Sequence, residues 1–144
     1  MTWTMKKIGF FIITVLSSML FACSNQNLVS DKEAKEIVDT YDITAFSVVI
    51  DTNEQSEVLS ASFTEKKDRS EAEYSHKKDE VHLHGKKALD KINDALEKMK
   101  PTPETEETEL IKQVAEAFEF SDYKMIKIEI TFKGHDSKEI MFSK

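Results

Sequence analysis

Residues 125–132 read MIKIEITF, and this stretch decides how we expect the chain to fold. Apolar residues occupy every second position, namely Ile126, Ile128, Ile130 and Phe132. The residues between them are charged or polar. Because successive side chains of a β-strand point to opposite faces, this alternation predicts a strand with one face in the core and the other in water.

The same period of two recurs along the chain and predicts further strands. The segments 43–51 (ITAFSVVID) and 58–67 (VLSASFTEKK) flank a turn-rich break, which predicts an antiparallel hairpin. EAEYSH at 71–76 is a weaker third strand with Tyr74 directed inward, and EVHLHG at 80–85 is a short continuation or an edge segment. At the other end, KEIMFS at 138–143 returns along MIKIEITF after the turn KGHDS.

Between the two strand pairs, the apolar period becomes that of a helix. The segment 86–100 (KKALDKINDALEKMK) carries one apolar stripe, formed by Leu89, Ile92, Leu96 and Met99. Pro101 and Pro103 end this helix and precede a second one at 104–120, because proline disrupts a helix interior but is tolerated in its first turn. Near the N-terminus, Ser30 and Glu33 have the spacing of a capping box, which predicts a short helix at 31–39.

These elements predict one α+β domain in the order β-β-(β)-α-α-β-β. Each strand has one apolar face and each helix one apolar stripe, so two layers bury all of them. We therefore expect an antiparallel sheet of four to five strands, with two helices packed on one face and the other face solvated. Strands and helices do not alternate as in βαβ units, which argues against a doubly wound fold.

The N-terminal segment has the pattern of an export signal. Lys6 and Lys7 precede an apolar run that ends at Ala22, shorter than the ~20 residues of a spanning helix. Leu20-Phe21-Ala22-Cys23 resembles the lipobox of bacterial lipoproteins, and this resemblance implies that Cys23 receives a diacylglyceryl group and becomes the mature N-terminus. The alternative is an uncleaved anchor helix in which Cys23 is an unmodified thiol.

The expected organisation follows from this signal. Residues 1–22 form the lipoprotein signal peptide, 23–42 the lipidated cysteine and a tether, and 43–144 the folded domain. A flexible tether over residues 24–40 reaches about 20–25 Å. Met1 and Met5 are alternative starts for the chain. Cys23 is the only cysteine, so no disulfide within the chain is expected.

Charge excludes one class of partner and defines the role of the lipid. The chain has 20 basic and 27 acidic residues, a net charge of −7, and no basic patch, so we expect no nucleic-acid partner. Removal of residues 1–22 takes away Lys6 and Lys7 and no acid, which changes the net charge from −7 to −9. An anionic membrane surface repels such a domain, so the lipid must supply the attachment.

Residues 43–142 resemble the YusW-like proteins of Gram-positive bacteria. The similarity lies in the lipoprotein signal, in a G-x-x-A-L start of the first long helix at Gly85–Leu89, in a helix that closes with Ala117-Phe118, and in a terminal hairpin that begins with Phe132-Lys133. The hairpin turn here reads FKGHDS, which differs from the F-K-D-G type of that family. The resemblance implies the fold and a location at the extracytoplasmic face of the cytoplasmic membrane, and it implies no activity.

The sharpest chemical candidate is VHLHG at 81–85. On a strand, His82 and His84 point to the same face, and His76 or Asp79 could supply a third ligand for zinc or copper. The alternative is that Val81 and Leu83 pack into the core, so that both histidines are simply exposed on the solvated face.

We find no catalytic set. No serine lies in a G-x-S-x-G setting, no glycine-rich loop could cradle phosphate, and the acidic run at Glu104–Glu109 lacks the spacing of a calcium loop. Carboxylates for a hydrolase are so abundant that none stands out. We therefore expect a non-enzymatic, lipid-anchored module that binds a protein, a peptide or an envelope component, without a cofactor; the alternative is a metal-binding lipoprotein that uses the histidine pair.

Overall fold

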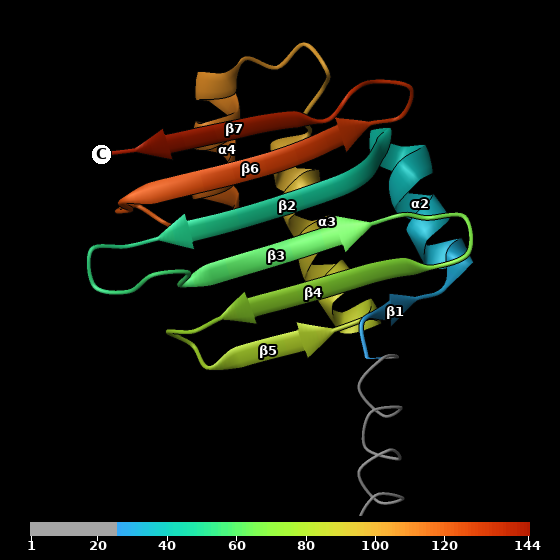
Figure 1. The fold of residues 1–144 in the computed structure, drawn as a ribbon, viewed down its shortest axis with the longest axis horizontal. Coiled ribbons are helices and arrows are strands. Elements are labelled where there is room, and N and C mark those ends of the chain that lie inside the picture. Colours follow the sequence, from blue (N-terminus) through green and yellow to red (C-terminus); the bar gives the residue numbers. More distant parts are fainter. Residues whose placement is uncertain (1–25) are drawn as a thin grey trace, which may run out of the picture.

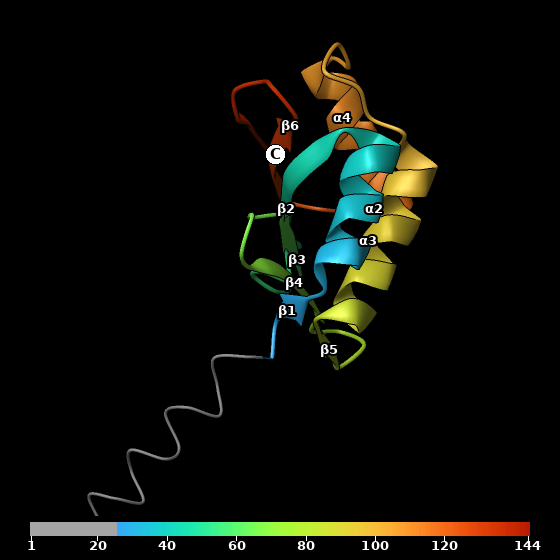
Figure 2. The same cartoon turned by 90° about the vertical axis from the view of Figure 1, so that its right-hand side faces the viewer.

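The computed structural model describes residues 26–144, and Figures 1 and 2 show it from two directions. The described residues form a seven-stranded antiparallel sheet and three helices, which confirms the predicted α+β class. Figure 2 shows the three helices on one face of this sheet. The elements along the chain are β1 (Leu28–Val29), α2 (Asp31–Tyr41), β2 (Ile43–Asp51), β3 (Leu59–Thr64), β4 (Ser70–His76), β5 (Val81–His84), α3 (Lys86–Met99), α4 (Glu107–Ala117), β6 (Met125–Phe132) and β7 (Lys138–Ser143).

The strands lie in the order β1-β4-β3-β2-β6-β7, and β5 pairs with β4 beside β1. The β2–β6 pair joins the N-terminal and C-terminal strands: Val48 is opposite Ala61 of β3 on one side and Ile128 of β6 on the other. Every strand pair is antiparallel. The two predicted hairpins therefore lie side by side in one sheet (Figure 1).

The core lies between the helices and the covered face of the sheet. The alternation predicted from MIKIEITF is observed, because Ile126, Ile128 and Ile130 are fully buried. Helix α3 buries its predicted apolar stripe against the sheet, with Ile92 and Leu96 fully inaccessible. Burial of such side chains contributes roughly 1.5–3 kcal/mol each, so this layer is the main source of stability.

The strand and helix counts differ from the predicted four to five strands and two helices. The weak strand at 71–76 and the edge segment at 80–85 are both strands of the sheet, as β4 and β5. The additional strand, β1, has only two residues, so it carries no alternation that a sequence pattern could reveal. The additional helix, α2, contains the predicted short helix 31–39 and extends it to Tyr41.

The folded region consequently begins before the predicted boundary at Ile43. Ser30 caps α2, since its Oγ accepts a hydrogen bond from the backbone N–H of Glu33 at 3.3 Å. The apolar side of α2 is buried in the core, through Ala34, Ile37 and Val38. From Leu28 onward the chain is therefore part of the domain rather than a tether. The predicted signal peptide and Cys23 lie outside the described residues.

Gly85 connects β5 to α3 at a point where the N-terminal segment passes close by. Its φ is +61° and its ψ −132°, a conformation that residues with a Cβ rarely adopt. A Cβ at this position would lie 2.8 Å from the carbonyl oxygen of Leu28 and 3.4 Å from that of Gln26. Glycine is thus required both by the backbone conformation and by the contact with β1.

We predict that Gly85→Ala destabilises the domain more than Gly134→Ala. Gly134 also has a positive φ, of +77°, but nothing lies within 4 Å of a Cβ built there. Gly134→Ala should therefore cost only the backbone strain, about 1–2 kcal/mol, whereas Gly85→Ala also displaces β1. Urea denaturation followed by circular dichroism measures both free energies of unfolding. Equal losses would show that the contact with Leu28 is unimportant.

Candidate metal-binding cluster

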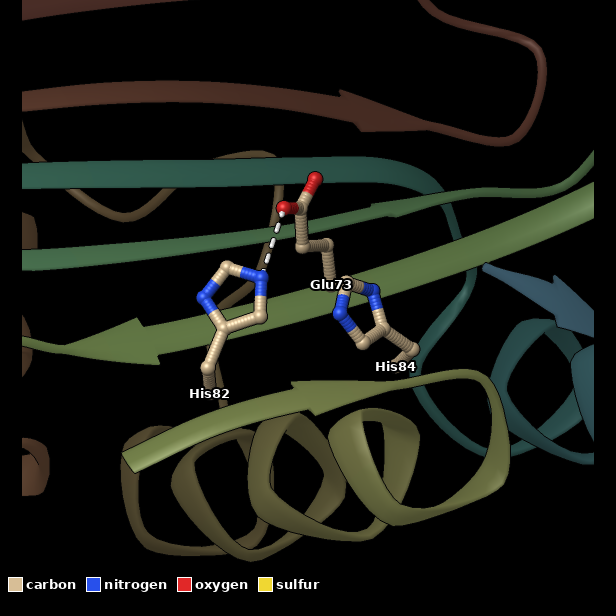
Figure 3. Close-up of side chains that lie close together, drawn as sticks. All are labelled: Glu73, His82 and His84. Carbon is tan, nitrogen blue, oxygen red and sulfur yellow. Dashed lines mark ion pairs between the residues drawn. The ribbon is translucent and has the colours of Figure 1, made fainter. Parts of the chain in front are cut away.

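The hairpin formed by β4 and β5 brings together three side chains that could hold a metal ion. In its register, Glu73 is opposite His84 and Ser75 is opposite His82. Glu73, His82 and His84 therefore share the face of the sheet opposite the helices. Figure 3 shows the three side chains gathered beside one another, from two adjacent strands.

The distances within this cluster would allow the three side chains to bind the same metal ion. His82 Nε2 lies 3.6 Å from Glu73 Oε1, and the ring centroids of His82 and His84 are 4.5 Å apart at 61°. One potential ligand atom from each residue lies within 4.8 Å of the other two. Within residues 26–144, this is the only group of three histidine, cysteine or acidic side chains that meets this criterion.

A bound ion would require a small contraction of the cluster. Ligand atoms at about 2.0–2.1 Å from a tetrahedral zinc ion are roughly 3.3 Å from one another. The Glu73 and His82 side chains are 44% and 55% exposed, so they can rotate by this amount without disturbing the core. The cluster is therefore accessible from solvent and adjustable.

Asn27 holds one member of the cluster in place. Its Oδ1 is hydrogen-bonded to Nδ1 of His84. An amide oxygen only accepts, so Nδ1 of His84 carries a proton, and in the neutral ring Nε2 keeps the lone pair that a metal needs. A hydrogen bond at the second ring nitrogen is the usual way in which proteins orient a histidine ligand.

His76 is not brought to this pair, contrary to the prediction that it could supply the third ligand. It is opposite Val81 in the hairpin, and thus on the covered face with Tyr74 and Leu83. Its ring stacks on Phe120 at 5.5 Å, and its side chain is only 13% exposed.

Asp79, the other predicted third ligand, lies beside His76 and not beside His82 and His84. Its Oδ2 lies 3.6 Å from Nδ1 of His76. Leu83 packs against the core, as the non-metal interpretation of VHLHG predicted, while His82 and His84 remain together on the opposite face.

Tyr74 is excluded as an anionic ligand by its surroundings. Burial raises the pKa of its phenol, and the carboxylates of Asp79 and Glu119 raise it further. The side chain therefore stays protonated at neutral pH. It also packs against the core, on the face opposite the cluster.

Glu73 is the potential third ligand that the sequence interpretation does not include, and hairpin register points to it. A four-residue connection, 77–80, pairs His76 with Val81, and counting outward from this pair places Glu73 opposite His84. Asn27 could not have been found in this way, because it lies in the segment assigned to a tether.

Comparisons with known proteins identify the family but no relative of known activity. No curated protein and no solved structure matches the chain. In the described part, no helix is long and apolar enough to cross a membrane. The family model described as YusW-like protein matches residues 44–134, which extend from β2 to the turn after β6 and include Glu73, His82 and His84. The chain therefore belongs to the YusW-like family.

Proposed function

We propose that this protein is a lipid-anchored, extracytoplasmic, non-enzymatic lipoprotein whose domain binds a divalent transition-metal ion. The observation that carries the metal proposal is the convergence of Glu73, His82 and His84 on one face of the β4–β5 hairpin, with ligand atoms within 4.8 Å. Glu73 replaces His76 as the third ligand of the histidine pair.

The ligand chemistry favours zinc or copper. Imidazole nitrogen suits these ions, whereas Mg²⁺ and Ca²⁺ prefer sites made entirely of oxygen. Three protein ligands leave a fourth position for water or for a donor atom of a partner molecule. We therefore expect exchangeable capture of the ion rather than a closed structural site.

A binding role is favoured over catalysis by the position of the cluster. His82 and Glu73 are about half exposed at the edge of a sheet. Metal-dependent catalysis works best in a water-excluding site, where electrostatic interactions with the transition state are strong. An exposed site at a sheet edge lacks this environment.

The anchor proposal is supported by Leu20-Phe21-Ala22-Cys23 and by charge. A lipidated Cys23 holds the domain at the membrane although its net charge, −9 after removal of residues 1–22, opposes that location. Two acyl chains suffice for stable attachment, at ~0.8 kcal/mol for each buried CH₂ group. The YusW-like resemblance agrees with an export signal in a Gram-positive bacterium.

We predict that His82→Ala combined with His84→Ala abolishes high-affinity binding of Zn²⁺ and Cu²⁺. Loss of an outer-shell partner typically lowers metal affinity roughly 10–100-fold. Loss of two side chains that bind the ion directly should lower it by more. Isothermal titration calorimetry of each ion into the protein measures the effect. His135→Ala is the matched control, because His135 is exposed in the turn before β7 and away from the cluster. No binding heat with the unaltered protein would refute the metal proposal.

We predict that Cys23→Ser releases the protein from the membrane. Intact-mass spectrometry of the wild-type protein, expressed in a Gram-positive host, should show a chain that begins at Cys23 and carries a diacylglyceryl group. Ser24→Ala is the control and should remain lipidated and in the membrane fraction. A wild-type chain that retains residues 1–22 would instead support the uncleaved anchor.

A second candidate function, binding of a peptide or protein partner, is favoured by the exposed edge of the sheet at β7. Met141 and Phe142 are 70% and 39% exposed there. Beside them, a hollow of about 400 Å³ lies between α4 and β7, with Ile111, Phe120 and Tyr123 in its lining. An extended partner segment could pair with β7 and place an apolar side chain in this hollow.

We predict that a photo-crosslinking residue at Met141 gives one discrete crosslinked product in intact cells. The same residue at Glu54, in the exposed loop between β2 and β3, is the control. A partner bound along β7 reacts only with the first position, and gel electrophoresis with immunodetection separates the products. Identical products from both positions would exclude β7 as a specific binding edge.

A further inference from the structure

We propose that metal binding at Glu73, His82 and His84 is coupled to docking of the N-terminal strand β1, with Asn27 as the connecting residue. This inference rests on the proposed metal-binding function. It adds that attachment of the segment 27–29 to the sheet raises the affinity for metal, and that bound metal in turn favours this attachment.

The backbone pairing that holds this segment to the sheet is short, and the buried side chain of Val29 adds to it. Its strand consists of Leu28 and Val29 alone, paired with Glu71 and Ser70. The backbone carbonyl of Asn27 accepts a hydrogen bond from the N–H of Ala72 at 2.9 Å. A two-residue strand at a sheet edge opens locally at a low free-energy cost, so a single added interaction changes its docked population.

The hydrogen bond between Asn27 and His84 joins this segment directly to the metal cluster. Nδ1–H of His84 donates to Asn27 Oδ1, which leaves Nε2 for the ion. A cation at Nε2 withdraws electron density from the ring and makes Nδ1–H a stronger donor. Metal binding therefore strengthens attachment of Asn27, and attachment of Asn27 presents His84 in the tautomer that binds metal.

Gly85 provides a second connection between metal binding at His84 and docking of β1. It follows His84, and its N–H donates to the carbonyl of Ala72 at 3.0 Å, the same residue whose N–H holds Asn27. A Cβ at Gly85 would meet the carbonyl of Leu28 at 2.8 Å, so the backbone after His84 lies against β1. The position of His84 is thus tied to the segment 27–29 through backbone contacts as well as through its ring.

By thermodynamic linkage, the effect of Asn27 attachment on metal affinity must equal the effect of bound metal on Asn27 attachment. If an attached Asn27 raises metal affinity by a given factor, bound metal raises the equilibrium constant for attachment by the same factor. Asn27 is therefore a positioning residue, and its role can be measured from both directions.

The test compares Asn27→Ala, Asn27→Asp and Asn53→Ala in the full chain, purified in detergent. Titration calorimetry with Zn²⁺ should show that Asn27→Ala weakens binding by about 10-fold or more. Asn27→Asp, which keeps an oxygen acceptor for Nδ1–H, should retain wild-type affinity or exceed it. Asn53→Ala, in the exposed β2–β3 loop, should change nothing.

Hydrogen exchange at the Ala72 amide gives the second readout. Saturating Zn²⁺ should slow this exchange in the wild-type chain, by the same factor by which Asn27→Ala weakens zinc binding, and should leave it unchanged in Asn27→Ala. One outcome would refute the coupling and leave the proposed function intact: the wild-type chain and Asn27→Ala bind zinc equally well, and zinc does not change hydrogen exchange at Ala72. Absence of zinc binding by the wild-type chain would overturn both.

Discussion

The pairing of β2 with β6 is the interaction on which the rest of this structure depends. It joins strands that are distant in sequence, and it places the hairpins from both ends of the domain in one sheet. Helices α3 and α4 lie between these hairpins in the chain, so they must cross the sheet on one side to complete the connection. The single covered face, the buried isoleucines of β6 and the apolar stripe of α3 all follow from that pairing.

Alternation along β5 places the side chain that packs against the core and the two histidines on opposite faces of the sheet. On β5, Leu83 belongs to the core, while His82 and His84 are on the opposite face. The two interpretations of VHLHG therefore do not compete: Leu83 packs against the core, and strand alternation places both histidines together on the other face. The adjacent strand then adds Glu73 by register alone. Three side chains that could hold a metal ion are thus brought together on this hairpin by residues that do not belong to the core.

What the sequence could and could not predict follows from the length and regularity of each pattern. MIKIEITF and the stripe of α3 are long enough for their period to be unambiguous, and they define the α+β class. The capping box at Ser30 correctly marked a helix, but nothing in the sequence placed it on the sheet. β1 is too short for any period, so the sequence predicts a tether for the segment that contains Asn27. Spacing alone suggests His76 as a partner of His82, because it does not reveal that the hairpin turn puts them on opposite faces.

The early start of the folded region changes how the domain would sit at a membrane. Asn27 already contacts the sheet, and only three residues lie between it and Cys23, whereas a tether through residue 42 would reach much farther. The four Cα–Cα steps from Cys23 to Asn27 span at most about 14 Å when fully extended. With Cys23 lipidated as proposed, the edge formed by β1 and β5 is confined next to the lipid headgroups. Anionic headgroups concentrate divalent cations within a Debye length of their surface. The cluster would therefore sample the ion-rich layer at the bilayer and not the bulk solution.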